Sequence, residues 1–411
     1  METDNLIEVV DRRNSPSVKW NSGAVKSICN NSTATPFWVA DMDFKSPLAV
    51  REALAKATEH GLFGYSKFDE VEESYIKWAK EWHFWSVDKS LIIPFSGMLS
   101  SISLLIELYS KEGDSIILPM PAYNPFIRII KGLNRKIVKW ELSYDSLKGR
   151  FSLDFDSLEK LAKSENSPLL LFCSPHNPTG RVFSYDEIDT IAQIAKTNNI
   201  TVISDEIHSD LKHPLFVHTP FDVVAKKYDL ECATCVSPSK TFNIAGEHFS
   251  YIICSEETMY KRVSARQKAL NLRPSLLATT MALAAYKEGK TYLNSLLDYL
   301  VKNSSLLENS FKDSPLKYVK PEASFIALID CSSIAERVSV DAKNNSALYD
   351  PLSSPEGGLL SRFFGLRASV AMNDGSWFGK EYSNFVRFNF GTEFNLVNWA
   401  ADSMLEAVSR L

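Results

Sequence analysis

The sequence lacks the features that would place the protein in a membrane, outside the cell or on nucleic acid. No apolar run approaches the ~18 residues of a membrane-spanning helix. The opening METDNLIEVVDRRN has neither the basic start nor the apolar stretch of a secretory signal. Lysine and arginine number 45 against 50 for aspartate and glutamate, so the net charge is −5. Such a mildly acidic chain has no electrostatic footprint for nucleic acid. We therefore expect a cytoplasmic protein whose partners include neither a membrane nor a nucleic acid.

Cysteine is also scarce, with six in 411 residues. Cys232 and Cys235 form a C-x-x-C pair, which is compatible with a redox site or half a zinc site. No second pair or histidine partner follows at zinc spacing, and the surrounding ECATCVSP is typical of a buried strand. Buried cysteines behave as small apolar side chains. We expect reduced core cysteines and no metal site.

Short apolar runs alternate with helical patterns through the middle of the chain. The runs are bounded by proline, glycine or charge: SIILP (115–119), LLLFC (169–173), TVISD (201–205), ATCVS (233–237) and FSYIIC (249–254). Residues 98–109 predict a buried helix and residues 185–198 an amphipathic one. Strands buried on both faces between helices indicate an α/β fold with a mostly parallel central sheet.

From about residue 292 the pattern changes. A long helix (292–312), strands at 325–330 and 386–390, a loop-rich stretch around 351–358 and a final helix predict a smaller α+β domain. We predict a large domain over residues 48–290 and a small domain formed by residues 1–47 with 291–411.

Three predicted strands end in unusual polar residues. SPHNPTG (174–180) follows LLLFC, Asp205-Glu-Ile-His208 ends TVISD, and Ser237-Pro-Ser-Lys240 follows ATCV. In open parallel sheets, ligands bind beyond the carboxyl ends of the strands. An amide, a carboxylate and a lysine at these ends therefore predict a site.

These residue types suit pyridoxal 5′-phosphate (PLP), which needs a lysine for its aldehyde and an anion at its pyridine nitrogen. Lys240 follows a buried strand, where burial would lower the pKa of its amine. Asp205 suits the ring nitrogen and Asn177, between two prolines, the ring hydroxyl. Each has an ordinary alternative: Lys240 as a solvated loop lysine, Asp205 as a helix cap, Asn177 as a turn residue.

The phosphate and an amino-acid substrate would need further partners. Ser96-Gly97-Met98 precedes the predicted buried helix, and a helix N-terminus binds phosphate, although a plain helix cap explains these residues equally well. Tyr123 in PAYNP could stack on the cofactor ring or merely pack. Arg387 in an apolar strand could bind a carboxylate, with a structural ion pair as the alternative.

The motifs SPSKTFNIAG, SPHNPTG, SDEIHSD and PFWVADMDFKSP together resemble the class I/II aminotransferase superfamily of fold-type I PLP enzymes. WVADMDF and SDEIHSD resemble in particular its cystathionine β-lyase-like C–S lyases, the cystalysin-like group. The resemblance runs from about residue 6 to about residue 400. It implies the fold-type I architecture, a PLP cofactor and a homodimer.

The resemblance also implies a role for each candidate residue. Lys240 forms the Schiff base with PLP, Asp205 pairs with the pyridine nitrogen and Tyr123 stacks on the ring, so these three are the candidate catalytic residues. The remaining cofactor contacts would come from Asn177, Ser96, Gly97, Met98, His208, Ser237, Ser239 and, across the dimer interface, Tyr65. The substrate would contact Arg387 through its carboxylate, together with Asn177, Tyr65, Ala40 and Asp41.

Some positions depart from the family pattern. GYSKF, PEASF and the end of VRFNFGTEF differ from the usual forms, and the stretch 335–370 is longer than expected. Glu247 and His248 put charge near the phosphate end, where an uncharged stretch is common. The substrate pocket is therefore less standard than the cofactor site.

We expect a C–S β-lyase that converts cystathionine or another S-substituted cysteine to pyruvate, ammonia and a thiol. An aminotransferase is the alternative, because the sequence HNPTG is common in aminotransferases. Another PLP reaction in a specialised biosynthetic pathway is a further alternative. A PLP-binding regulatory protein is a third class, but the intact set of Lys240, Asp205, Asn177 and Arg387 argues against it.

Overall fold

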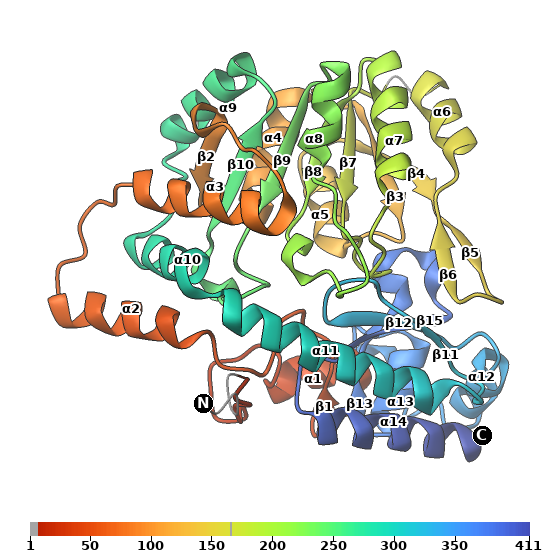
Figure 1. Cartoon of the computed structure of the whole chain (residues 1–411). Coiled ribbons are helices and arrows are strands. Elements are labelled where there is room, and N and C mark those ends of the chain that lie inside the picture. Colours follow the sequence, from red (N-terminus) through yellow and green to blue (C-terminus); the bar gives the residue numbers. More distant parts are fainter. Residues whose placement is uncertain (1–6, 165–166) are drawn as a thin grey trace.

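A seven-stranded sheet forms the centre of the larger body of the computed structural model, which describes residues 7–164 and 167–411 (Figure 1). In sheet order its strands are β2 (Ile92–Phe95), β10 (Ser250–Cys254), β9 (Cys232–Val236), β8 (Thr201–Asp205), β7 (Leu169–Cys173), β3 (Ser115–Met120) and β4 (Lys136–Glu141). The run from β9 to β4 is parallel, whereas β10 is antiparallel to both β9 and β2. The predicted α/β fold with a mostly parallel central sheet is confirmed.

Helices cover both faces of this sheet. In Figure 1, α7 (Tyr185–Thr197) and α8 (Phe221–Ala225) lie in front of it, and α4 (Met98–Tyr109) and α5 (Asn124–Gly132) lie behind it. The other helices of this part of the chain are α2 (Leu48–His60), α3 (Asp69–His83), α6 (Phe155–Ser164), α9 (Glu257–Leu270) and α10 (Leu276–Glu288).

The N-terminus of α7 shows how the local sequence determines where a helix begins. The Ser184 hydroxyl accepts the N–H of Glu187, and the Glu187 carboxylate accepts the N–H of Ser184, so the first turn is satisfied by a capping box. Ile188, Ile191 and Ala192 are then buried on one side of the helix. The predicted helices at 98–109 and 185–198 are both present.

The second body is built on a four-stranded antiparallel sheet in the order β11 (Lys317–Val319), β12 (Ile326–Asp330), β15 (Phe385–Asn389) and β14 (Asn373–Asp374). Its helices are α11 (Lys290–Phe311), α12 (Ala335–Asn344), α13 (Leu359–Arg367) and α14 (Phe394–Ser409). The chain's early residues also reach this body, because β1 (Thr35–Pro36) pairs with β13 (Val370–Ala371). The remaining elements are α1 (Ser22–Cys29) and the hairpin of β5 (Ser143–Asp145) and β6 (Arg150–Ser152). The domain boundaries near residues 48 and 290 stay a prediction.

All six cysteines are buried and free, and the C-x-x-C pair lies inside β9, as the strand-like pattern indicates. Within the two described ranges, no helix combines the length and apolar character needed to cross a membrane.

Candidate active site

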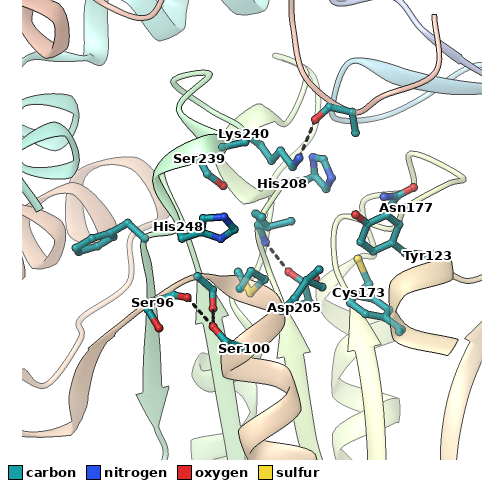
Figure 2. A pocket seen from close by; sticks show the side chains of 18 residues that line it. Ser96, Ser100, Tyr123, Cys173, Asn177, Asp205, His208, Ser239, Lys240 and His248 are labelled. Atoms are coloured by element: carbon teal, nitrogen blue, oxygen red, sulfur yellow. Dashed lines mark hydrogen bonds between the residues drawn. The ribbon is translucent and has the colours of Figure 1, made fainter. Parts of the chain in front are cut away.

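A cavity of about 350 Å³ lies where β7, β8 and β9 reach their carboxyl ends (Figure 2). Cys173 and Asp205, the last residues of β7 and β8, are direct neighbours in the sheet register. The loops that follow these strands therefore emerge side by side, as the sequence predicts. Most of the predicted site residues line the cavity: Ala40, Ser96, Gly97, Met98, Tyr123, Asn177, Asp205, His208, Ser239 and Lys240.

The Lys240 side chain enters the cavity from the loop after β9. Its Nζ donates a hydrogen bond to the Ala40 carbonyl at 2.7 Å. Burial lowers the pKa of the amine to about 8, and the nearby Arg387 charge acts in the same direction. A sizeable neutral fraction is therefore present near neutral pH, and a neutral amine is both a nucleophile and a base.

Asp205 is the anion of the cavity. Its carboxylate is buried, and Oδ1 accepts the backbone N–H of Ile207 at 3.0 Å. Burial raises the pKa of this carboxyl to about 7, against the effect of the Ile207 hydrogen bond. A cationic ligand group beside it would favour the charged form.

The N-terminus of α4 forms another wall. Its N-cap residue Gly97 has φ of 97° and ψ of 154°, a conformation suited to glycine, and no side chain of the described ranges caps the helix. Ser96 and Ser239 add hydroxyls beside it. Ser237 does not line the cavity itself, but its Oγ lies 2.9 Å from that of Ser239. Free N–H groups at a helix start, flanked by hydroxyls, suit an anion.

Arg387 lies next to the cavity on β15 and is 4% exposed. Its Nη1 donates to Asn177 Oδ1 at 3.1 Å, and its Nη2 donates to the Trp38 carbonyl and to Asn373 Oδ1. These acceptors are all neutral, and no carboxylate of residues 7–164 and 167–411 forms an ion pair with Arg387. Burial lowers the pKa of the guanidinium to about 10. The structural ion pair left open by the sequence is therefore not found there, and the charge is available for an anion.

Two aromatic residues complete the predicted lining. Tyr123 is half-buried beside Phe126, and burial raises the pKa of its hydroxyl. Burial lowers the pKa of His208 to about 3, so its imidazole is neutral, and its Nδ1 lies 3.1 Å from Ser324 Oγ.

Two predicted site residues, Tyr65 and Asp41, do not line the cavity. Tyr65 is fully exposed on the connection between α2 and α3, which extends away from the body of the molecule in Figure 1. Asp41 follows Ala40, but its carboxylate pairs with Arg12 at 2.8 Å. Neither is among the residues that line the cavity of its own chain.

The cavity also includes residues that sequence reasoning did not place there: Leu99, Ser100, Phe126, Cys173, Ile207, Ala245 and Phe249. Several of these adjoin predicted residues along the chain, which is a usable signal. His248, expected as charge near the phosphate end, also lines the cavity, and its Nδ1 lies 3.2 Å from the place that a Cβ at Gly97 would take.

The family described as "Aminotransferase class I and II" matches residues 35–401. The chain is 33% identical to "Cystathionine beta-lyase PatB" of Bacillus subtilis over 328 residues, 79% of this chain and 84% of PatB. Cystalysin from Treponema denticola, whose structure contains PLP, aligns with a TM-score of 0.86 at 28% identity over 99% of both chains. The PLP-bound C–S lyase from Staphylococcus hominis aligns with a TM-score of 0.85 at 26% identity, over 98% of this chain and 97% of that one.

These matches span nearly the whole described fold and agree with the motifs around Lys240, Asp205 and Asn177. The predicted family and the fold-type I architecture are confirmed: the chain belongs to the aminotransferase class I and II family.

Proposed function

We propose that the protein is a PLP-dependent carbon–sulfur lyase that acts on cystathionine or another S-substituted cysteine. The relatives named as a cystathionine β-lyase and a C–S lyase support the reaction class. The observation that carries the proposal is one cavity that holds the Lys240 amine and the Asp205 carboxyl, with Asn177 linking it to the Arg387 guanidinium. An amine, an anion and an anion-binding arginine are what PLP and an amino-acid substrate require.

The donor set of the cavity fits PLP, which when bound draws electrons away from the Cα of an amino-acid substrate. Asp205 would hold the pyridine nitrogen, whose positive charge offsets the cost of a buried carboxylate. The Oδ1 of Asn177 is engaged by Arg387, so its Nδ2 remains to donate to the ring hydroxyl. Tyr123 would cover one ring face, and the start of α4 with Ser96 and Ser239 would hold the phosphate.

The chain's own side chains supply the remaining chemistry. Arg387 binds the substrate carboxylate and fixes the direction of the Cα–H bond. Lys240, with a pKa near 8, accepts the Cα proton at Nζ. The Cβ–S bond then breaks, and sulfur leaves with the electron pair and takes up a proton as the thiol. Addition of water to the three-carbon remainder gives pyruvate and ammonia, so the reaction balances without a second keto substrate.

The products distinguish this reaction from transamination. We expect the PLP-loaded protein to release pyruvate, ammonia and homocysteine in equal amounts from L-cystathionine with no 2-oxo acid present. Lys240→Ala should abolish this release. Formation of a new amino acid only after addition of a 2-oxo acid, with no thiol released, would replace the lyase proposal by the aminotransferase.

A further inference from the structure

A second group of buried polar side chains, outside the lining of the cavity, centres on Asp210, in η2 (Ser209–Leu211). Its Oδ1 accepts the Trp78 Nε1 hydrogen at 2.9 Å and lies 2.8 Å from His83 Nε2. Its Oδ2 accepts the Thr241 hydroxyl at 2.9 Å. Trp78 and His83 belong to α3, and Thr241 directly follows Lys240. One carboxylate therefore joins three segments that are distant in sequence.

The charge state of this group fixes the direction of its hydrogen bonds. Burial alone would raise the pKa of Asp210, but the hydrogen bonds from His83, Trp78 and Thr241 hold it below the ordinary value. Burial lowers the pKa of His83, so its neutral ring donates the Nε2 hydrogen. Asp210 thus accepts three hydrogen bonds as a carboxylate, and the Thr241 hydroxyl must donate to it.

The chain around Lys240 is held by the packing of the buried Phe242 ring against Trp78 and by two polar side chains. Residues 237–244 form turns between β9 and the next short helix, without a regular ladder to hold them. Thr241 ties this segment to Asp210. Asn243 exchanges hydrogen bonds with the backbone of Met42 at 3.0 and 2.9 Å and donates to the Phe44 carbonyl. Two polar side chains within three residues of Lys240 therefore fix the backbone from which its side chain extends.

We propose that Asp210 is a positioning residue for Lys240 and acts through the Thr241 hydroxyl. A flexible lysine can reach its partner only if its backbone starts from a fixed place and direction, and a displacement of ~1 Å of a reacting group can cost ~10²-fold in rate. Asp210 supplies that fixed place by tying Thr241 to α3, the helix that ends in His83. The inference rests on the proposed role of Lys240 as the reacting amine.

The test compares Thr241→Val, which keeps the side-chain shape without the hydroxyl, with Thr241→Ser, which keeps the hydroxyl. The first measurement is the rate at which the cofactor-free full-length chain takes up PLP on Lys240, followed by absorbance and located by borohydride reduction and peptide mapping. The second is kcat and KM for pyruvate release. We expect Thr241→Val to lower the capture rate and kcat about tenfold with KM within about twofold, and Thr241→Ser to stay near the parent.

Trp78→Phe is the matched control, because it removes a hydrogen bond to Asp210 but keeps the His83 contact to Asp210 and an aromatic ring to pack against Phe242. It should lower the Tm as Thr241→Val does but leave the capture rate and kcat near the parent values. If Trp78→Phe slows capture as much as Thr241→Val does, the effect is general destabilisation and the proposal is wrong. Equal defects in the valine and serine variants, or none in either, would overturn it too.

Two further outcomes are separable. If Thr241→Val does not fold, Thr241→Ala takes its place, since the vacated space can admit water to Asp210. If the parent chain captures PLP on Lys240 but releases no thiol, the lyase proposal fails while the capture rates still decide the role of Asp210.

Discussion

Burial moves the pKa of Asp205 to about 7 and that of Lys240 to about 8, in a cavity that holds both side chains. A carboxyl with a raised pKa costs stability once it must ionise. The stability that its protonation contributes is fully present below the unfolded pKa near 3.8 and is lost as the pH rises through the folded pKa of about 7. Ionisation of Asp205 in the cofactor-free fold therefore costs free energy of folding, and a cationic ligand group beside the carboxylate would offset that cost.

This gives a prediction for the cofactor-free chain. Asp205→Asn should unfold at a higher temperature than the parent at pH 8, by a free energy of about 4 kcal/mol at 1.36 kcal/mol per pKa unit. The advantage should shrink as the pH is lowered from 8 to 5, because the parent carboxyl then becomes protonated in the fold. Thermal unfolding at several pH values measures it, and a pH-independent difference would contradict the raised pKa. With PLP present the order should reverse.

Arg387 carries the second prediction at this scale. Arg387→Ala should raise the KM for L-cystathionine about 100-fold, since two charge-assisted hydrogen bonds to a carboxylate are together worth about 3 kcal/mol. Arg387→Lys keeps the positive charge but cannot form the bidentate hydrogen bonds of a guanidinium, so it should recover only part of the affinity for L-cystathionine. Steady-state kinetics of the three proteins provides the measurement, and an unchanged KM in the alanine variant would remove Arg387 from the carboxylate role.

Lys240, Asp205 and Asn177 could be identified from the sequence because each lies at or just after the end of a predicted strand and within a recognisable motif. The sequence could not decide whether Arg387 has an ionic partner, since that depends on β12, β14 and the segment at Trp38, which meet only in the fold. His248 was expected as charge near the phosphate end, but its exact place on the cavity wall is set by the loop after η4 (Ala245–Glu247).

At the scale of elements, the strand directions were harder to predict than the strands themselves. β10 is buried along its whole length whichever way it runs, so its apolar run does not reveal that it is antiparallel. No helix was predicted between the strands at 325–330 and 386–390, whereas α12 and α13 lie there. Val338 is the only buried residue of α12, so this polar segment offers few apolar positions from which to predict a helix.

The start of α4 gives the prediction at this scale. Gly97→Ala places a side chain in a conformation that costs about 1–3 kcal/mol and brings its Cβ to 3.2 Å from His248 Nδ1. The helix start should shift, and the affinity for PLP should fall about tenfold or more, as measured by equilibrium dialysis. Ser103→Ala, at a half-buried position of the same helix that does not line the cavity, is the control and should leave the affinity unchanged. Unaltered PLP binding in Gly97→Ala would exclude this helix start from the phosphate site.

At the scale of the whole molecule, the connection between α2 and α3 is an extended segment that carries a group of exposed apolar side chains. The connection between α2 and α3 presents Leu62 at 69%, Phe63 at 59% and Tyr65 fully exposed, and apolar side chains grouped in this way mark an interaction surface. We propose that a second copy of the chain covers them and that Tyr65 then reaches the phosphate end of the other subunit's cavity. A mass from light scattering equal to one chain would contradict this.

Mixing two defective chains tests the exchange of Tyr65 directly. Tyr65→Ala should bind PLP weakly, and Lys240→Ala should be inactive, so each variant alone should show almost no lyase activity at limiting PLP. In a hybrid dimer, the site that contains the intact Lys240 receives its tyrosine from the Lys240→Ala subunit and is complete. Random exchange of subunits should therefore restore about a quarter of the parent activity, because half of the dimers are hybrids with one working site each. If Tyr65 served only its own chain, no site in any hybrid would be complete and mixing would restore nothing.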